Sequence, residues 1–386
     1  MDSRPEADPA ADSASIVSVL SPQAPTELMD FPHTFAELQH GIDSRLHLGA
    51  QLAICRDGEL IADLALGERA FGLPMTPQTI LPWMSCTKPV TAVAVALLQE
   101  AGRLDWDQPV AEILPEFAAQ GKEAISIRQL LTHTCGLRFP NARLDELDWD
   151  ESIAAICAMP IEKDWIPGRT AGYHVATSFY LLGEIVRRLD GRSLEGFVSD
   201  EIFFPLEMSR CSLVASPVDE DVGGFFRTDA SEPRPALDRS GGSSRCPLRP
   251  GASGRGPARE LLRFVEMMLG RGEWQGRRVL NPRTADALLH RHREGLLDLT
   301  FGKTIDWGLG FMLDSKKHQR DYPYSFGPYC SGDTFGHNGN QCSAAYGDPR
   351  HELAVAFIFN GQPGDDKHNA RINRLNAAIY RDLGLD

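Results

Sequence analysis

The sequence lacks several features that would assign it to large functional classes. No stretch of the 386 residues approaches twenty uninterrupted apolar residues, so we expect no transmembrane helix. Positive charge is scarce, because 39 Lys and Arg stand against 53 Asp and Glu. The resulting net charge of −14 argues against nucleic acid and anionic membranes as partners.

Cysteine pairs and targeting signals are also missing. The eight cysteines form no C-x-x-C pair and no metal-ligand spacing, and we interpret them as packed, reduced thiols of a cytoplasmic protein. Residues 1–28 lack the basic start and apolar stretch of a signal peptide and are expected to form a flexible arm. The remainder is long enough to bury one large core or two moderate ones.

The most informative stretch is 84–89 (MSCTKP), which is followed by the apolar run 90–98. Pro89 lacks an N–H and fits the first turn of a helix, so Ser85 is expected at a helix N-terminus, with Lys88 one turn along. This spacing brings an amine within reach of a hydroxyl that becomes nucleophilic only when a base takes its proton. A structural interpretation is equally open, because serine is a favoured N-cap residue.

The apolar periodicity along the rest of the chain predicts an α+β fold. We expect helices at 32–46, 125–134, 181–189 and 258–269, strands at 51–55, 60–64, 307–313, 334–339, 343–347 and 352–360, and a last helix with Ile372, Leu375 and Ile379. Strands at both ends suggest one sheet built from 29–84 and 295–386, with a helical domain, 85–294, inserted. The segment 218–256, crowded with Gly and Pro, is expected to form a long loop over the cleft.

Four motifs occur in an order that resembles a known family. They are Ser85-x-x-Lys88, the run 126–136 (SIRQLLTHTCG), Tyr173-His174 ahead of LLGEIV, and 336–339 (GHNG) ahead of AAYGDP. Together they resemble the serine β-lactamase and penicillin-binding-protein superfamily, nearest its class C-like esterase and transacylase branch, over roughly 30–385. The resemblance implies a β-lactamase-like fold, in which N- and C-terminal helices flank an antiparallel sheet and a mostly helical domain is inserted.

The resemblance also implies catalytic roles for the matching residues. Ser85 would be the acylated nucleophile, Lys88 would relay its proton, and Tyr173 would act as the base and later protonate the leaving group. A free tyrosine, with a pKa of about 10, is a weak base at neutral pH, so we expect the charge of Lys88 to lower the pKa of Tyr173. His337 stands where many relatives carry lysine, and a histidine is charged only part of the time.

The expected substrate-binding groups lie around the same positions. The oxyanion hole would consist of the backbone N–H groups of Ser85 and of Asn340, just beyond Gly339. His174 and Phe226 complete the expected binding residues. Structural alternatives remain for two of the catalytic candidates: Tyr173 could be a buried aromatic with a bonded hydroxyl, and His337 could be a strand histidine facing water.

Departures from the family pattern narrow the expected function. Val175 stands where many relatives have the asparagine that binds a substrate amide, and no carboxylate sits in a motif like that of class A β-lactamases. We therefore expect a serine hydrolase or acyltransferase that forms an acyl-Ser85 intermediate from a small ester or amide, with no cofactor and no metal. Water, an amine or an alcohol could accept the acyl group. β-Lactamase activity, D-Ala-D-Ala-type peptidase activity and an inactive ligand-binding protein are the alternatives.

Overall fold

The computed structural model describes residues 30–386 apart from 216–220, 237–246 and 321. The predicted arm at 1–28 and part of the predicted loop at 218–256 therefore lie outside the described residues. Both ends of the described chain contribute to one seven-stranded sheet, in which every pair of neighbouring strands is antiparallel. In spatial order its strands are β12 (Met312–Leu313), β13 (Phe335–Gly339), β14 (Ser343–Asp348), β15 (Leu353–Phe359), β1 (Gly49–Arg56), β2 (Glu59–Ala70) and β3 (Leu73–Pro74).

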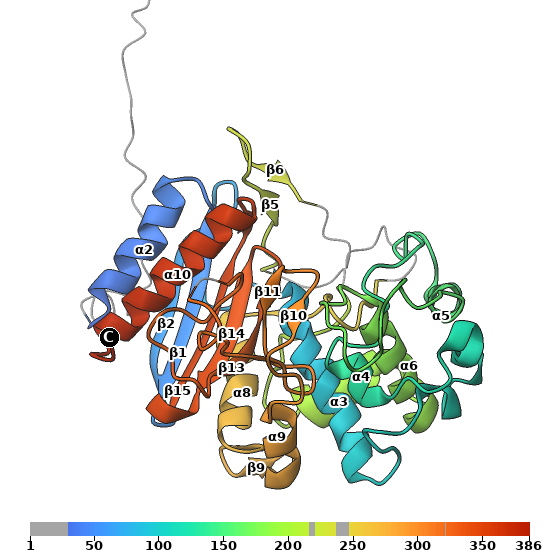
Figure 1. The fold of residues 1–386 in the computed structure, drawn as a ribbon. Coiled ribbons are helices and arrows are strands. Elements are labelled where there is room, and N and C mark those ends of the chain that lie inside the picture. Colours follow the sequence, from blue (N-terminus) through green and yellow to red (C-terminus); the bar gives the residue numbers. More distant parts are fainter. Residues whose placement is uncertain (1–29, 216–220, 237–246, 321) are drawn as a thin grey trace, which may run out of the picture.

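Helices cover both faces of this sheet (Figure 1). On one face, α2 (Pro32–Asp43) packs against α10 (Asp365–Asp382), and α8 (Ala258–Leu269) lies against the other. Successive side chains of a strand point to opposite faces, so Leu52 of β1 contributes to the core under α2 and α10, while Ala53 contributes to the core under α8. Because both faces are covered, β1 is buried along almost its whole length.

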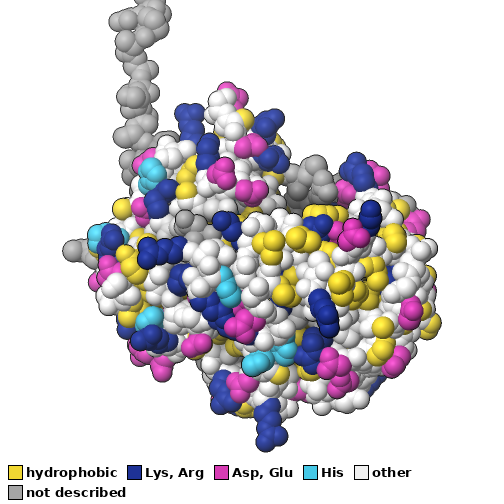
Figure 2. Space-filling view, in the orientation of Figure 1, with side chains coloured by type: hydrophobic (Ala, Val, Ile, Leu, Met, Phe, Trp, Pro, Cys, Tyr) yellow, Lys and Arg dark blue, Asp and Glu magenta, His cyan; other side chains and the backbone are white. Residues whose placement is uncertain are grey.

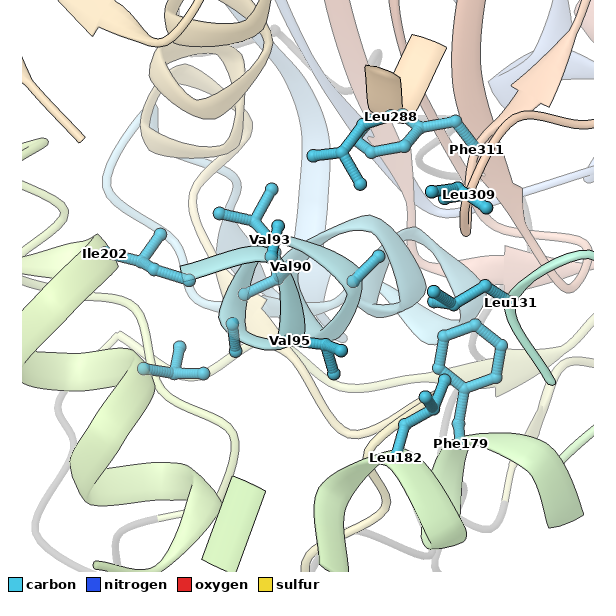
Figure 3. Close-up of a cluster of buried hydrophobic side chains, with 14 of the residues drawn as sticks. Val90, Val93, Val95, Leu131, Phe179, Leu182, Ile202, Leu288, Leu309 and Phe311 are labelled. Atoms are coloured by element: carbon cyan, nitrogen blue, oxygen red, sulfur yellow. The ribbon is translucent and has the colours of Figure 1, made fainter. Parts of the chain in front are cut away.

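A helical lobe stands beside the sheet and is built around α3. Its helices are α3 (Lys88–Glu100), α4 (Ile127–Leu131), α5 (Trp149–Cys157), α6 (Thr177–Asp190), α7 (Leu194–Val198) and α9 (Pro282–Leu289). Figure 3 shows Val90, Val93 and Val95 of α3 pointing outward into a shell of apolar side chains from the neighbouring elements. A helix that is apolar on all sides belongs in the interior, and ten of the residues of α3 are buried.

Most of the predicted elements are confirmed, and the predicted arrangement of an antiparallel sheet flanked by terminal helices is confirmed with them. The strand predicted at 307–313 is wrong for most of its length, since only its last residues form a strand, β12, while Trp307 makes isolated bridges to Arg293 and Met312. Gly310 has a φ of 79°, and the N–H of Gly308 bonds to the carbonyl of Phe311, so the chain turns there. The helix predicted at 125–134 ends early because His133 adopts a φ of 58°.

Shorter elements connect the sheet and the lobe. The remaining strands are β4 (Leu81–Pro82), β5 (Phe226–Arg227), β6 (Arg234–Pro235), β7 (Arg255–Gly256), β8 (Glu273–Trp274), β9 (Arg277–Arg278), β10 (Leu297–Asp298), β11 (Lys303–Thr304) and β16 (Gly361–Gln362). Although α8 falls within the segment 85–294 that we assigned to the helical domain, it packs on the sheet. Within the described ranges, none of the helices has the length and apolar character needed to span a membrane.

Candidate active site

Ser85 lies in η1 (Met84–Thr87), a 3₁₀ turn that runs directly into α3, as the position of Pro89 predicted. The residue before it, Met84, has a φ of 50°, in the left-handed region that is costly for residues other than glycine. The hydroxyl of Thr87 donates to the Met84 carbonyl at 2.6 Å and helps to hold this turn. Strain of this kind is common at functional sites, where it sets the direction of a side chain.

Two polar side chains converge on the Ser85 hydroxyl. Lys88 Nζ lies 3.1 Å from Ser85 Oγ, and the Tyr173 hydroxyl donates to the same oxygen at 2.8 Å. Lys88 comes from the same turn, whereas Tyr173 comes from the link between α5 and α6. The three residues that the sequence motifs single out as a proton-transfer group therefore lie within hydrogen-bonding distance around one oxygen atom.

The environment of Lys88 favours the neutral form of its amine near pH 7. Burial lowers the pKa of Lys88 from 10.5 to about 7. Besides Ser85, its Nζ contacts the carbonyl oxygens of Val175, at 3.1 Å, and Gly251, at 3.0 Å. A neutral amine can give its two N–H bonds to these carbonyls, and its lone pair is then left to accept the proton of the Ser85 hydroxyl.

Tyr173 differs from our expectation. We expected the charge of Lys88 to lower the pKa of Tyr173, but burial raises it. The reason is that Lys88 is itself buried and only partly charged near pH 7, so it offers little positive charge to set against the desolvation of a phenolate. Tyr173 is therefore a neutral hydrogen-bond donor to Ser85 Oγ in this site.

A buried ion pair that the motifs did not indicate holds Tyr173 in place. Asp298 Oδ1 accepts bonds from the backbone N–H groups of Tyr173, Thr300 and Phe301, at 2.9 to 3.1 Å. Its other oxygen accepts from Arg293 Nη2 at 2.6 Å, and both side chains are almost fully buried. No local pattern marks Asp298, which lies 125 residues from Tyr173 in the chain, and this separation explains why sequence reasoning missed it.

The end of β13 lies against the serine turn. Gly339 is so close to the Trp83 carbonyl that a Cβ atom there would come within 2.2 Å of it, so only glycine fits. His337 is buried, its ring centroid lies 6.0 Å from that of Tyr173, and its Nε2 has no hydrogen-bond partner among the described residues. Burial lowers the pKa of His337 to about 3, so this histidine is neutral rather than partly charged. Asn340, the next residue after Gly339, is exposed at the rim.

Two of the predicted binding residues lie away from the Ser85 hydroxyl. His174 is fully buried, and its Nε2 accepts the N–H of Leu137 at 2.9 Å, so it supports the backbone. Phe226 lies in β5, and its ring packs on Phe71 at 5.1 Å between centroids. In the described structure neither side chain forms a hydrogen bond or a ring contact with Ser85, Lys88 or Tyr173.

The cysteines nearest the site are buried, consistent with packing roles. Cys86 Sγ lies 3.1 Å from the His337 carbonyl and 3.3 Å from Ser343 Oγ, and burial raises the pKa of the Cys86 thiol to about 12. Cys342 is equally buried, and its pKa is also raised by burial. Such thiols remain protonated and unreactive near pH 7. Among the described residues, no group of three or more His, Cys, Asp or Glu side chains is arranged to hold a metal ion.

A pocket of about 290 Å³ adjoins the two carbonyl groups that hold Lys88. Val175 and Gly251 form part of its wall, and its volume is at the small end of ligand pockets. The other apolar residues in its lining are Pro140, Ala142, Leu144, Ala176, Tyr180 and Ala252, and its charged residues are Arg143, Asp145 and Arg249. Figure 2 shows apolar side chains gathered over the helical lobe on the face in view. The pocket is therefore suited to an apolar group.

The fold and this serine–lysine–tyrosine group define a serine hydrolase of the penicillin-recognising type. The Beta-lactamase family model matches residues 35–379, and the chain belongs to this family. It is 26% identical over 350 residues to Esterase/beta-lactamase LipL of Mycobacterium tuberculosis, covering 81% of this chain and 77% of the relative. Two solved structures are similar: a penicillin-binding protein homologue from Caulobacter crescentus (TM-score 0.78, 30% identity) and a family VIII carboxylesterase (TM-score 0.77, 25% identity). Each match covers 92% of this chain and 98% of the other.

Proposed function

We propose that this serine hydrolase is an esterase that forms an acyl-Ser85 intermediate from small esters with an apolar acyl group. The observation that carries the proposal is the position of Ser85 Oγ between Lys88 Nζ, at 3.1 Å, and the Tyr173 hydroxyl, at 2.8 Å. Because the pKa of Lys88 is about 7, its side chain is a neutral amine in a large fraction of molecules at physiological pH. Similarity to LipL and to a family VIII carboxylesterase supports ester substrates.

In the acylation step, Ser85 Oγ forms a bond to the acyl carbonyl carbon, while its proton moves to Lys88 Nζ. The carbonyl oxygen becomes an oxyanion that accepts bonds from the backbone N–H groups of Ser85 and Asn340. When the bond to the leaving oxygen breaks, that oxygen takes a proton from the Tyr173 hydroxyl, which its raised pKa keeps protonated until this moment. Water then carries the proton from Lys88 back to the Tyr173 phenolate, and the acyl-enzyme is complete.

Deacylation reverses these proton movements with a new nucleophile. Water, an amine or an alcohol loses its proton to the Lys88 amine as it attacks the acyl carbon. The bond from the acyl carbon to Ser85 Oγ then breaks, Ser85 Oγ takes a proton from the Tyr173 hydroxyl, and water returns the Lys88 proton to the Tyr173 phenolate. Val175 stands near this position with a side chain that is 45% exposed, where it offers no hydrogen bond to orient a water molecule. We therefore propose that hydrolysis is slow and that an amine or alcohol acceptor can compete with water.

The pocket beside Val175 and Gly251 suggests which acyl groups the esterase would prefer. Its lining is largely apolar and its volume of about 290 Å³ limits the size of the group it can hold. Each methylene that enters such a pocket contributes about 0.8 kcal/mol. Over a series of p-nitrophenyl esters, kcat/KM should therefore rise by about fourfold for each added methylene from acetate until the pocket is full, and then fall.

The decisive experiment is covalent labelling of Ser85. The protein is treated with a fluorophosphonate or with p-nitrophenyl butyrate, and the intact mass and the labelled peptide are measured. A single label on Ser85 that is absent from Ser85→Ala supports the proposal, since that variant loses one hydroxyl and keeps the fold. Labelling of Ser85→Ala at the wild-type rate would place the nucleophile elsewhere. The ratio of amide to free acid at increasing amine concentration then measures acyl transfer against hydrolysis.

A further inference from the structure

We propose that Arg371 of α10 is a positioning residue for the oxyanion hole, which it strengthens by polarising the N–H of Asn340 through the turn at 339–342. The inference rests on the proposed function, because it takes this N–H to be a donor to the oxyanion. Arg371 does not touch the substrate. Its effect passes through two peptide groups of the turn that joins β13 to β14.

Arg371 is a buried cation with neutral partners. Its side chain is 3% exposed, and it donates to the carbonyl groups of Leu46, Gln341 and Gly361. Its remaining bonds, both of 2.9 Å, go to Nδ1 of two buried histidines, His47 and His368. No carboxylate within the described residues forms an ion pair with it.

The guanidinium of Arg371 nevertheless keeps its charge. Burial lowers the pKa of Arg371 to about 9, which leaves it protonated at pH 7. The pKa values of His47 and His368 are lowered well below their usual range, also by burial, so both rings are neutral acceptors. A buried charge without a counter-ion is costly, and here its field falls on the dipoles around it.

Two peptide groups connect this charge to the oxyanion hole. Arg371 Nη2 donates to the Gln341 carbonyl at 3.1 Å, and the N–H of the same peptide group, that of Cys342, donates to the Gly339 carbonyl at 3.2 Å. The N–H of that second peptide group belongs to Asn340. Each bond in such a chain polarises the next, by an estimated ~10–30% per bond. The chain starts at a full positive charge and ends at an N–H that has no acceptor in the described structure.

Bonds that do not involve Arg371 also hold the turn at 339–342 in position. The effect of the Arg371 charge can therefore be tested separately from the position of the turn. Gln341 has a φ of 54°, and its side chain accepts the N–H of Gly364 at 2.8 Å and donates to Asp365 at 3.0 Å. Gln362 Nε2 donates to the Asn340 carbonyl at 3.0 Å. These three bonds do not involve Arg371. We therefore expect that removal of the Arg371 charge leaves the turn in place and weakens only the polarisation of the Asn340 N–H.

The test compares three substitutions of Arg371 with a control on the same helix. Arg371→Met removes the charge and the donors, Arg371→Gln keeps a donor without charge, and Arg371→Lys keeps the charge. Arg374→Met is the control, because Arg374 lies on the outer side of α10 and pairs with Glu37 at 3.0 Å. Each protein is acylated with a p-nitrophenyl ester whose carbonyl is isotope-labelled. The carbonyl stretching band of acyl-Ser85 and the kinetic constants are measured.

We expect Arg371→Met and Arg371→Gln to shift the carbonyl band to higher wavenumber and to lower the acylation rate by about tenfold, with KM unchanged. This loss is smaller than the ~10²–10³ found when an oxyanion-hole donor is removed outright. Arg371→Lys should restore most of the band position, and Arg374→Met should match the wild type. Because the band reports the field at the carbonyl, a loss of stability alone does not move it.

Two results would overturn the inference, and they are distinguishable. If acyl-Ser85 forms in the wild type and in Arg371→Gln with the same band position and the same rate, Arg371 is only structural. If wild-type protein forms no acyl-Ser85 with any ester in the series, the proposed function itself fails and the inference fails with it. Should Arg371→Met not fold, the comparison of Arg371→Gln with Arg371→Lys decides the question, since these differ in charge and both retain a donor.

Discussion

The titration of Lys88 gives the sharpest prediction. With a pKa of about 7 instead of 10.5, roughly half of the molecules carry a neutral amine at pH 7, compared with about one in three thousand for an ordinary lysine. The acylation rate, measured as kcat/KM for p-nitrophenyl butyrate, should therefore rise tenfold per pH unit below about pH 7 and level off above it. In Lys88→Met, kcat/KM should no longer rise with pH below pH 7. It should also fall by a factor of about 10²–10⁴, which is the usual contribution of a general base.

The same titration has a signature in stability. Between pH 7, the folded pKa of Lys88, and pH 10.5, its unfolded value, the unfolded chain binds more protons at Lys88 than the folded chain does. The contribution of Lys88 to the free energy of unfolding therefore increases with pH in this window. Below pH 7 both states are protonated and the cost of burying the charge is present in full. The free energy of unfolding of the wild type, relative to Lys88→Met, should thus rise by about 1.4 kcal/mol per pH unit within this window.

Denaturant titrations at several pH values, together with the rate profile, test this reasoning. Lys303→Met is the control, because Lys303 is exposed on β11 and its loss should leave both profiles unchanged. A wild-type rate that stays constant from pH 8 down to pH 5 would refute the role of Lys88 as the base. A flat stability difference between pH 7 and pH 10 would refute the lowered pKa itself.

Three further substitutions test the surroundings of this base. Tyr173→Phe should lower acylation by about 10²–10³ and combine with Lys88→Met less than additively in rapid-mixing kinetics, because both act in one proton-transfer unit; fully additive barriers would argue for separate roles. Gly251→Ala places a Cβ 3.0 Å from Lys88 Nζ and should slow acylation by about tenfold with little change in Tm; an unchanged rate would mean that the amine has room to move. Asp298→Asn leaves Arg293 as a buried unpaired charge and should cost about 3–5 kcal/mol in a denaturant titration, and a loss below 1 kcal/mol would contradict the pair's structural role.

Local rules account for the part of the site that the sequence predicts well. The contact between Ser85 and Lys88 follows from helix geometry, since a spacing of three residues puts both side chains on one face. The strand-like runs at 343–347 and 352–360 and the apolar character of 90–98 likewise predict the two strands and the buried helix near this turn. Family resemblance, rather than periodicity, added Tyr173, because its contact with Ser85 spans 88 residues.

Other parts of the site depend on tertiary contacts that leave no local pattern. The Gly251 carbonyl that accepts from Lys88 lies 163 residues away from it, in a segment that the sequence marks only as a loop. The motif at 336–339 likewise does not indicate that the side chain of Gln341, just beyond it, turns to the start of α10 and bonds to Gly364 and Asp365. The pKa of Tyr173 was expected in the wrong direction because the depth of burial cannot be read from motif spacing.

The distribution of charge around Ser85 follows from the need to keep Lys88 basic while attracting an oxyanion. A fixed cation beside Lys88 would lower its pKa further and weaken it as a base, whereas burial alone brings this pKa close to neutrality. The three histidines around Tyr173, which are His133, His174 and His337, all have pKa values lowered by burial and contribute no charge. Arg293 is matched by Asp298. An oxyanion hole of backbone N–H groups, as proposed here, would then require any added positive charge to lie away from Lys88. Arg371 meets this requirement, since it lies behind the β13–β14 turn and bonds to that turn's backbone rather than to Lys88.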